Sequence, residues 1–293
     1  EHEAGPVDVV DDYFDRANLS PYLTGRSAVG GINFRTVSAD AEAAVQTIFV
    51  DMVGVDVINV VTASEANETV ENVEISLVLD ISGSMRFGDR VTPLRAAASE
   101  FIDIVLAGQR QDGTTVSIVP YAGQVNPGPI LFDLLGGVRD HPHSSCLFLE
   151  DADFDHSGMP NASTRQSPHF HKWDIAPSHM DWGWCPSDAA RIQPLSNDPV
   201  ALKNFINTFR LHDGTGTQFG MRWALAMLDP DSRSAMEVVR TSGGAPASAE
   251  GRPLDWNAQN AEKFIVLMTD GKITDQFEPK YTGFRDPDDD EED

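Results

Sequence analysis

The sequence predicts an α/β protein built on a doubly wound, mostly parallel sheet with an antiparallel edge. Short apolar runs rich in β-branched residues alternate with segments of helical periodicity, and two of these runs end on an aspartate. Alternating strands and helices favour parallel pairing, because a helix supplies the long crossover that a parallel strand needs. At 293 residues, the chain is long enough to bury a large core.

The charge balance limits the classes of partner. Acidic residues number 46 against 21 basic ones, which gives a net charge of −25 and argues against nucleic acid or an anionic membrane as a partner. No apolar run approaches the roughly 18 residues of a membrane-spanning helix. We therefore expect membrane attachment only through an anchor outside this sequence. Residues 279–293 are expected to form a solvated acidic tail.

The N-terminal part is expected to lead into the sheet. Residues 1–30 are interpreted as a wrap or linker without chemistry. Residues 31–72 are interpreted as a helix over 39–54 and a β-branched strand over 55–64. That strand is expected to pair as an antiparallel hairpin with the following strand, 67–80.

Residues 73–278 are predicted to form the main domain. The apolar run that ends at Asp80 is followed by a helical pattern, a strand, two more helical patterns and a final apolar strand, over 91–108, 114–123, 198–210, 217–229 and 263–271. The irregular segment 124–195 is predicted to be a loop-rich insertion, because it holds eight prolines and six of the eight histidines.

Oxygen-bearing side chains follow the two strands that end on aspartate. Asp80, Ser82 and Ser84 stand two residues apart, so an extended or tightly turned backbone would aim them at one point. Asp270 ends the last strand, and the carboxyl ends of neighbouring parallel strands are where sites form. Helix capping and turn formation are the alternative roles for serine and aspartate.

A Gly-rich loop over 213–220 opens a helix between these two strands and offers Thr215, or alternatively Thr217, as a hydroxyl ligand. Neutral oxygens with two carboxylates suit Mg²⁺, with Mn²⁺ or Ca²⁺ as alternatives. Because few protein anions neutralise such an ion, we expect it to stay electrophilic and to accept a carboxylate from a protein partner.

The insertion offers weaker signals. Cys146 and Cys185 bracket its central part and would form a disulfide in an exported protein, whereas two buried thiols are the alternative. Histidines at 140–143 and 168–174 lack the fixed ligand spacing of a zinc site. The alternating aspartates of 150–158 begin like a calcium loop, so a structural Ca²⁺ there is a further alternative, although the sixth position holds His156 instead of glycine.

Catalytic motifs are missing from the sequence. It has no Gly-x-Ser-x-Gly elbow, no His-Glu-x-x-His helix and no phosphate loop. We therefore expect a protein that is not an enzyme, with a hydrolase as the less favoured reading.

Three quoted stretches carry a family resemblance: "DISGS", "GT" before a helix, and "MTDG". In this order they resemble the three loops of a metal-ion-dependent adhesion site (MIDAS) in a von Willebrand factor A (vWA) domain. The resemblance implies a vWA fold in which one divalent ion is held by Asp80, Ser82, Ser84, Thr215 and Asp270. It also implies further strands and helices after the third loop, so the C-terminal part of the domain is expected to come from residues beyond this sequence or from another chain.

A wider pattern, "VEISLVLDISGSM", "VSIVPYAGQVN", "DWGWCPSD" and "KFIVLMTDG", is similar to bacterial TadG-type proteins of Tad/Flp pilus assembly and covers about 32–276. It implies an exported protein of the periplasm or cell surface, membrane-anchored at full length, with pilus or envelope components as partners. The implied function is a non-catalytic adhesion or scaffolding module. A metal-dependent regulatory vWA subunit of intracellular machinery is the alternative, and the disulfide separates the two.

Overall fold

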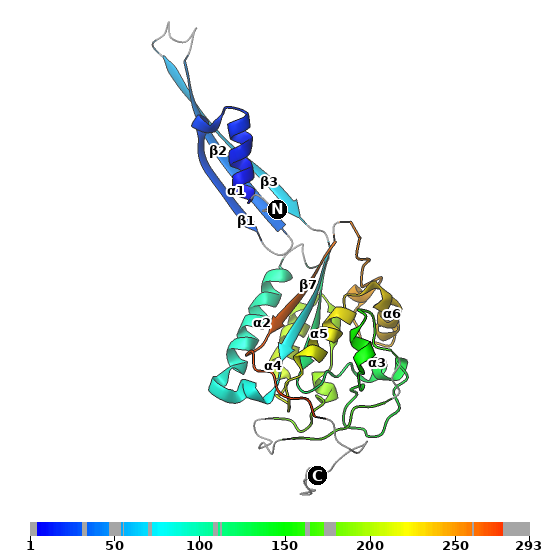
Figure 1. The fold of residues 1–293 in the computed structure, drawn as a ribbon. Coiled ribbons are helices and arrows are strands. Elements are labelled where there is room, and N and C mark those ends of the chain that lie inside the picture. The colour runs from blue at the N-terminus through cyan, green and yellow to red at the C-terminus, as the bar shows by residue number, and fades with distance from the viewer. Residues whose placement is uncertain are drawn as a thin grey trace. The chain divides into compact units, whose positions relative to one another are not determined.

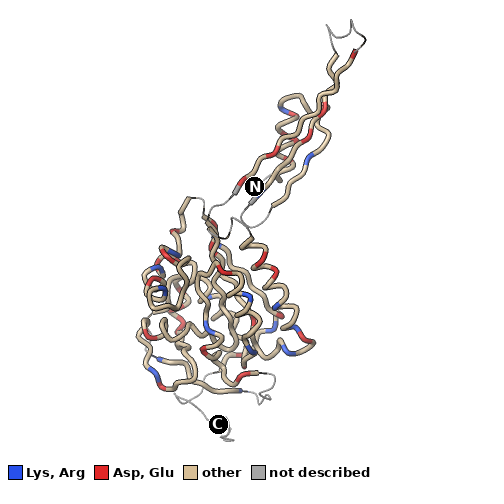
Figure 2. The backbone as a smooth tube through the Cα atoms, turned by 180° about the vertical axis from the view of Figure 1, so that it is seen from behind, with Lys and Arg blue, Asp and Glu red and all other residues tan. Residues whose placement is uncertain are grey.

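The computed structural model describes residues 5–30, 34–46, 54, 56–69, 72–107, 111, 113–161, 165–172, 180–259 and 261–277. The chain divides into two compact units, residues 1–70 and 71–293, and each is described by itself. Acidic residues are spread along both units, and basic residues are fewer (Figure 2). None of the helices in the described ranges combines the length and the apolar character that crossing a bilayer requires.

The first unit is a three-stranded antiparallel sheet with one helix. Its strands pair in the order β1-β2-β3, and α1 packs against β1 and β2 (Figure 1). The Arg26 guanidinium of β1 forms an ion pair with Asp11 of α1, 2.7 Å away. The elements are α1 (Pro6–Arg16), β1 (Leu23–Gly30), β2 (Phe34–Gln46) and β3 (Val57–Thr69).

Three expectations for this part of the chain were wrong. The segment 1–30 contributes α1 and β1 to a folded unit instead of serving as a linker. The helix expected over 39–54 is strand β2 up to Gln46, because it pairs with β3 at thirteen successive positions. The strand predicted over 55–64 overlaps β3 from Val57 onward, but it pairs with β2 and not with the strand that follows it.

The second unit is built on a mixed four-stranded sheet in the order β6-β5-β4-β7. Strands β4, β5 and β7 are parallel, and the short β6 runs antiparallel beside β5. This agrees with the predicted α/β class and with an antiparallel edge, although the edge comes from β6 and not from the expected hairpin. The strands are β4 (Asn72–Asp80), β5 (Thr114–Tyr121), β6 (Gln193–Ser196) and β7 (Ala261–Met268).

Helices cover the sheet of the second unit. Figure 1 shows α2 on one side of the sheet and α5, α3 and α6 on the other, and α2 packs against α4. The buried residues of α2, Leu94, Ala98, Ile102 and Val105, recur at the helical spacing seen in the sequence. The bounds are α2 (Val91–Val105), α3 (Pro129–Leu134), α4 (Pro199–Thr208), α5 (Thr217–Ala226) and α6 (Arg233–Thr241).

The core is continuous across the face of the sheet that α5 covers. Val78 of β4 and Val119 of β5 are fully buried there against Trp223 and Ala224 of α5. On the same face, the Ser76 hydroxyl donates to the carbonyl oxygen of Ala224 at 2.8 Å, which satisfies a buried polar group between strand and helix. The fold is therefore a layered α/β unit with a small mixed sheet, and it is not a clear doubly wound vWA fold.

The insertion 124–195 is largely irregular, as expected. It contains α3 and short bridges, and Cys146 and Cys185 form a disulfide with their Cα atoms 6.0 Å apart. Both cysteines are fully buried. The predicted acidic tail, 279–293, lies outside the described residues, as does part of the histidine-rich segment, 173–179.

Candidate functional site

The sheet brings three chain segments to one edge. Because β4 is parallel to both of its neighbours, Asp80 stands beside Tyr121 of β5, and Leu79 stands beside Met268 of β7. The loops that leave these strand ends therefore start at the same level. A fourth segment is attached by the backbone N–H of His212, which donates to the Ile81 carbonyl at 2.8 Å.

Asp80 lies at the centre of this edge and is fully buried. Its Oδ1 accepts the backbone N–H of Ser82 at 2.9 Å. Its Oδ2 accepts the hydroxyls of Thr269, at 2.7 Å, and Tyr121, at 3.1 Å. A carboxylate has about four lone-pair positions, so these three donors leave acceptor capacity for one more group.

Tyr121 is held as a hydrogen-bond donor. Burial, followed by the nearby Asp80 carboxylate, raises the pKa of Tyr121 above its ordinary value, so the phenol stays protonated at neutral pH. Thr217, the first residue of α5, donates its hydroxyl to the Tyr121 oxygen at 3.3 Å. Thr217 is therefore connected to Asp80 through one side chain.

Two serine hydroxyls adjoin the buried carboxylate. The Oγ atoms of Ser82 and Ser84 lie 3.0 Å apart, and both residues are buried. The Ser84 hydroxyl also acts on Asp270, since it contributes to lowering the pKa of that carboxyl. Asp80, Ser82, Ser84 and Asp270 therefore form one connected group, although they come from strand ends 190 positions apart in the sequence.

Asp270 is kept ionised by its neighbours. Burial alone would raise the pKa of its carboxyl, but hydrogen bonds from the Lys272 N–H, Arg90 and Ser84, and the charge of Arg90, lower that pKa below its usual value. The Lys272 N–H lies 2.9 Å from Oδ1, and Nη1 of Arg90 lies 2.5 Å from Oδ2.

Thr215 lies in the adjoining loop, but its described hydrogen bonds run elsewhere. Its N–H donates to the Thr274 hydroxyl at 2.9 Å, and its carbonyl accepts from the Gln276 amide at 3.1 Å. The side chain is buried. Thus the structure ties Thr217 to the Asp80 group by hydrogen bonds, whereas the described hydrogen bonds of Thr215 run to Thr274 and Gln276.

The loop around Thr215 is shaped by glycine. Gly214 has a φ of +77°, and a Cβ at this position would lie 2.7 Å from Gly123 Cα and from the Trp184 ring. The loop is closed on both sides by backbone hydrogen bonds, from Gly123 N to Asp213 O at 2.8 Å and from Gly216 N to Ala122 O at 2.6 Å. Only glycine combines this backbone conformation with so close an approach.

The donor set fits a hard divalent ion. Every side chain in the group offers oxygen, and oxygen is what Mg²⁺, Mn²⁺ and Ca²⁺ prefer. Adjacent ligand oxygens around an octahedral ion with bonds of about 2.1 Å lie about 3.0 Å apart. The observed Ser82–Ser84 separation of 3.0 Å meets this requirement without any movement of the loop.

The insertion gives no comparable group. His141 donates to the Ser167 carbonyl through Nε2 at 3.0 Å, and His169 shares a hydrogen bond between Nδ1 and the Ser144 hydroxyl at 3.0 Å. Asp153 accepts backbone N–H groups through both oxygens. No cluster of three or more His, Cys, Asp or Glu side chains suited to a metal occurs among the described residues. The zinc and calcium alternatives therefore gain no support.

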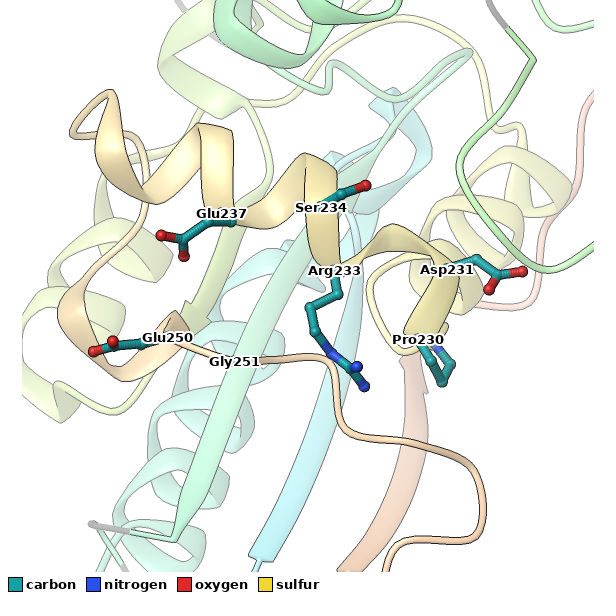
Figure 3. Close-up of a pocket in the computed structure, with 7 residues that line it drawn as sticks. All are labelled: Pro230, Asp231, Arg233, Ser234, Glu237, Glu250 and Gly251. Carbon is teal, nitrogen blue, oxygen red and sulfur yellow. The ribbon is translucent and has the colours of Figure 1, made fainter.

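A separate depression of about 610 Å³ opens on the surface beside α6. Its lining includes Pro230, Asp231, Arg233, Ser234, Glu237, Glu250 and Gly251 (Figure 3). The Arg233 guanidinium donates to the Pro253 carbonyl, and it pairs with Asp255 at 2.7 Å. Because its cation is used in this way and the other charged lining residues are acidic, the depression offers no convergent chemistry.

Sequence reasoning missed three residues of the site. Thr269 and Tyr121 could have been found, since Thr269 immediately precedes the suspected ligand Asp270 and Tyr121 is a polar residue near the end of a predicted strand. Arg90 gave no signal, because it lies six residues beyond Ser84 and reaches Asp270 only after the chain has turned.

Comparisons with known proteins give weak likenesses. No protein-family profile and no curated protein sequence matches the chain. Two solved structures of the pilus adhesin SpaC from Lactobacillus rhamnosus GG, one in its open conformation, match 85% of this chain at 14% identity with TM-scores of 0.32 and 0.33. The pilus adhesin RrgA from Streptococcus pneumoniae matches 84% at 15% identity with a TM-score of 0.26.

The chain spans 18% and 19% of the SpaC chains and 25% of the RrgA chain. Likenesses at these scores do not establish a shared fold.

Proposed function

We propose that this chain is a non-catalytic adhesion or scaffolding module that binds one divalent ion at a MIDAS-like site and recognises a partner carboxylate through that ion. The proposal rests on one observation, the convergence of Asp80, Ser82, Ser84 and Asp270 with a Ser82–Ser84 oxygen separation of 3.0 Å. Asp80, Ser82 and Ser84 would hold the ion, together with a hydroxyl from Thr215 or Thr217. The ion would be Mg²⁺, or Mn²⁺ or Ca²⁺.

The role of each residue follows from its bonding. Thr269 and Tyr121 orient the Asp80 carboxylate, and such supporting hydrogen bonds tune the affinity of metal ligands. Asp270 acts through Ser84 and water, since its oxygens already accept from Lys272 and Arg90. An ion held mainly by neutral hydroxyls keeps positive charge, which is what an incoming Asp or Glu of the partner would bind.

The acidity of the protein gives the ion a second role. At a net charge of −25, the chain repels other acidic surfaces at long range, although salt screens this repulsion beyond about 10 Å at 0.1 M. A bound cation reverses the sign locally. Contact with an acidic partner would then depend on the ion.

The buried disulfide supports an extracytoplasmic setting, because disulfides persist in oxidising compartments. Together with the resemblance to TadG-type proteins, it leads us to propose an exported protein linked to Tad/Flp pilus assembly, with pilus or envelope components as partners. The same reasoning disfavours the intracellular regulatory alternative.

Ion binding is the first test. Isothermal titration with MgCl₂, and Mn²⁺ titration followed by electron paramagnetic resonance, would be run on the wild type, Ser84→Ala and the control Ser234→Ala. We expect one saturable site that Ser84→Ala weakens about tenfold, through loss of one ligand, while Ser234→Ala binds normally because Ser234 belongs to α6 and lines the separate depression. Equal affinity in all three proteins, or no saturable binding, would rule the site out.

Partner capture is the second test. Wild type and Asp80→Ala would be used as bait on native envelope extract, each with and without EDTA. We expect the chelator to abolish capture by the wild type and to add little to the defect of Asp80→Ala. Capture that survives both treatments would show that another surface, such as that around Trp182, makes the contact.

A further inference from the structure

Arg90 is the one basic side chain that the described structure places against the acids of the proposed site. It immediately precedes α2, after a turn in which Gly88 and Asp89 adopt positive φ angles of 62° and 53°. Asp89 itself accepts the Thr92 hydroxyl at 2.8 Å, which links the turn to the first turn of α2. The turn thereby directs Arg90 back toward Asp270, with Nη1 2.5 Å from Oδ2.

The two partners differ in exposure. The Asp270 side chain is 3% exposed, whereas that of Arg90 is 49% exposed. A nearly buried carboxylate needs a compensating group, because an isolated buried charge is costly. Arg90 supplies that group while lying half in solvent. The pair therefore joins a nearly buried acid to a counter-ion that keeps part of its own hydration.

The charges at the strand ends set the consequence. Asp80 and Asp270 contribute two formal negative charges, and Arg90 contributes one positive charge beside them. A divalent ion would meet a site of net charge −1 with Arg90 in place and −2 without it. Among the described contacts of Asp270, Arg90 is the only basic side chain, so no other cation there would replace its charge.

We propose that Arg90 is a built-in counter-ion that holds Asp270 out of direct coordination and thereby lowers the affinity of the site for divalent ions. This inference rests on the proposed function. In the resting protein, Arg90 stabilises Asp270 in place of a metal. When an ion binds, the same ion pair keeps the second carboxylate occupied, so the ion retains the positive charge that a partner carboxylate recognises.

A matched control exists on the same loop. Arg86 carries the same charge, but its guanidinium donates to the Gly83 carbonyl at 2.6 Å and lies 4.2 Å from the centre of the Phe87 ring. Arg86→Gln therefore removes an equal charge from the same loop without touching Asp270. Any general effect of net charge will be the same in Arg86→Gln and Arg90→Gln.

The test combines two readouts. Mn²⁺ affinity would be measured by electron paramagnetic resonance for the wild type, Arg90→Gln and Arg86→Gln. Removing a charge next to the ion should tighten binding about fivefold or more at low salt, and less at high salt because screening weakens the interaction. Arg86→Gln should change the affinity less than Arg90→Gln does, because the Arg86 guanidinium donates to the Gly83 carbonyl and not to a carboxylate of the site.

The second readout needs no metal. Thermal unfolding in EDTA would be recorded for Arg90→Gln, Asp270→Asn and the double variant. We expect each single variant to lower the unfolding temperature by about 2–4 °C, and the double variant to lower it by clearly less than the sum, because both substitutions remove the same ion pair.

The outcomes separate the inference from the proposed function. Additive unfolding shifts in EDTA, or a wild type that binds Mn²⁺ while Arg90→Gln binds no tighter than Arg86→Gln, would overturn the inference and leave the proposed function standing. No saturable Mn²⁺ binding in any of the proteins would overturn both. Tighter binding confined to Arg90→Gln, with non-additive unfolding, would establish the counter-ion.

Discussion

Glu74 and Lys263 lie directly opposite each other in the parallel β4–β7 ladder, and Nζ of the lysine is 2.5 Å from Oε2 of the glutamate. Both side chains are buried, with 1% of Glu74 and 9% of Lys263 exposed. Glu74 also accepts from the Arg252 guanidinium at 3.1 Å and from the Leu254 N–H at 2.9 Å. One buried carboxylate thus joins two strands to the loop that precedes β7.

Glu74→Gln is expected to destabilise the second unit strongly. The substitution leaves the buried cations Lys263 and Arg252 without their anion, and breaking such a pair typically costs about 3–5 kcal/mol. Urea unfolding at pH 7 would measure the loss. Asp103→Asn is the control, because it removes an exposed ion pair to Lys203 and should cost less than about 1 kcal/mol. Similar losses in both variants would contradict the prediction.

His169 is expected to make the protein less stable as the pH decreases. Burial, and then the neighbouring imidazoles of His141, His143 and His212, lower the pKa of His169 to about 3. In the unfolded chain this histidine has a pKa near 6.5, so below that pH it binds a proton there while it stays neutral in the folded protein. The stability that it contributes is therefore fully present above about pH 6.5, decreases as the pH falls, and is lost near pH 3.

The substitution His169→Gln tests this pH dependence. At pH 5 the wild type should have lost about 2 kcal/mol through this histidine, so Gln at this position should reduce by that amount the difference in unfolding free energy between pH 7.5 and pH 5. Urea titrations at the two pH values give the measurement. Parallel pH profiles for the two proteins would show that His169 does not carry the effect.

The disulfide is expected to stabilise the insertion. Cys146 and Cys185 are 39 residues apart, and closing a loop of that length typically contributes about 2–4 kcal/mol. Reductant should therefore lower the unfolding midpoint of the wild type and leave that of a Cys146→Ser/Cys185→Ser double variant unchanged. Thiol titration of protein from its native compartment checks the bond directly, and two reactive thiols there would contradict both the bond and the proposed export.

The sequence was most informative where one pattern excluded its rivals. Strand β7 and helix α2 were predictable because an uninterrupted apolar run and a regular helical spacing each match one kind of element. In β2, alanine and glutamate favour a helix by intrinsic propensity, yet the same residues also alternate with period two. Pairing with β3 over thirteen positions decided the outcome, and that partner cannot be deduced from local propensity.

In the site, too, local sequence patterns predicted some features and tertiary packing decided the others. Asp80, Ser82, Ser84 and Asp270 could be grouped from sequence, because strand ends and two-residue spacing bring side chains together by simple geometry. The choice between Thr215 and Thr217 depends on the path of a glycine loop, and the position of Arg90 depends on two successive positive φ angles. Such backbone details are set by tertiary packing, which a single sequence does not display.

The parallel pairing of β4 and β7 also has a mechanical consequence. The chain enters β4 at Asn72, at one end of the ladder, and leaves β7 after Met268, at the opposite end. A tensile load applied between these two points would pull the strands along their length in opposite directions. The ladder would then be loaded in shear, so that its hydrogen bonds and the Glu74–Lys263 pair share the force and do not open one after another. A module of this construction can transmit tension across its sheet through many hydrogen bonds at once.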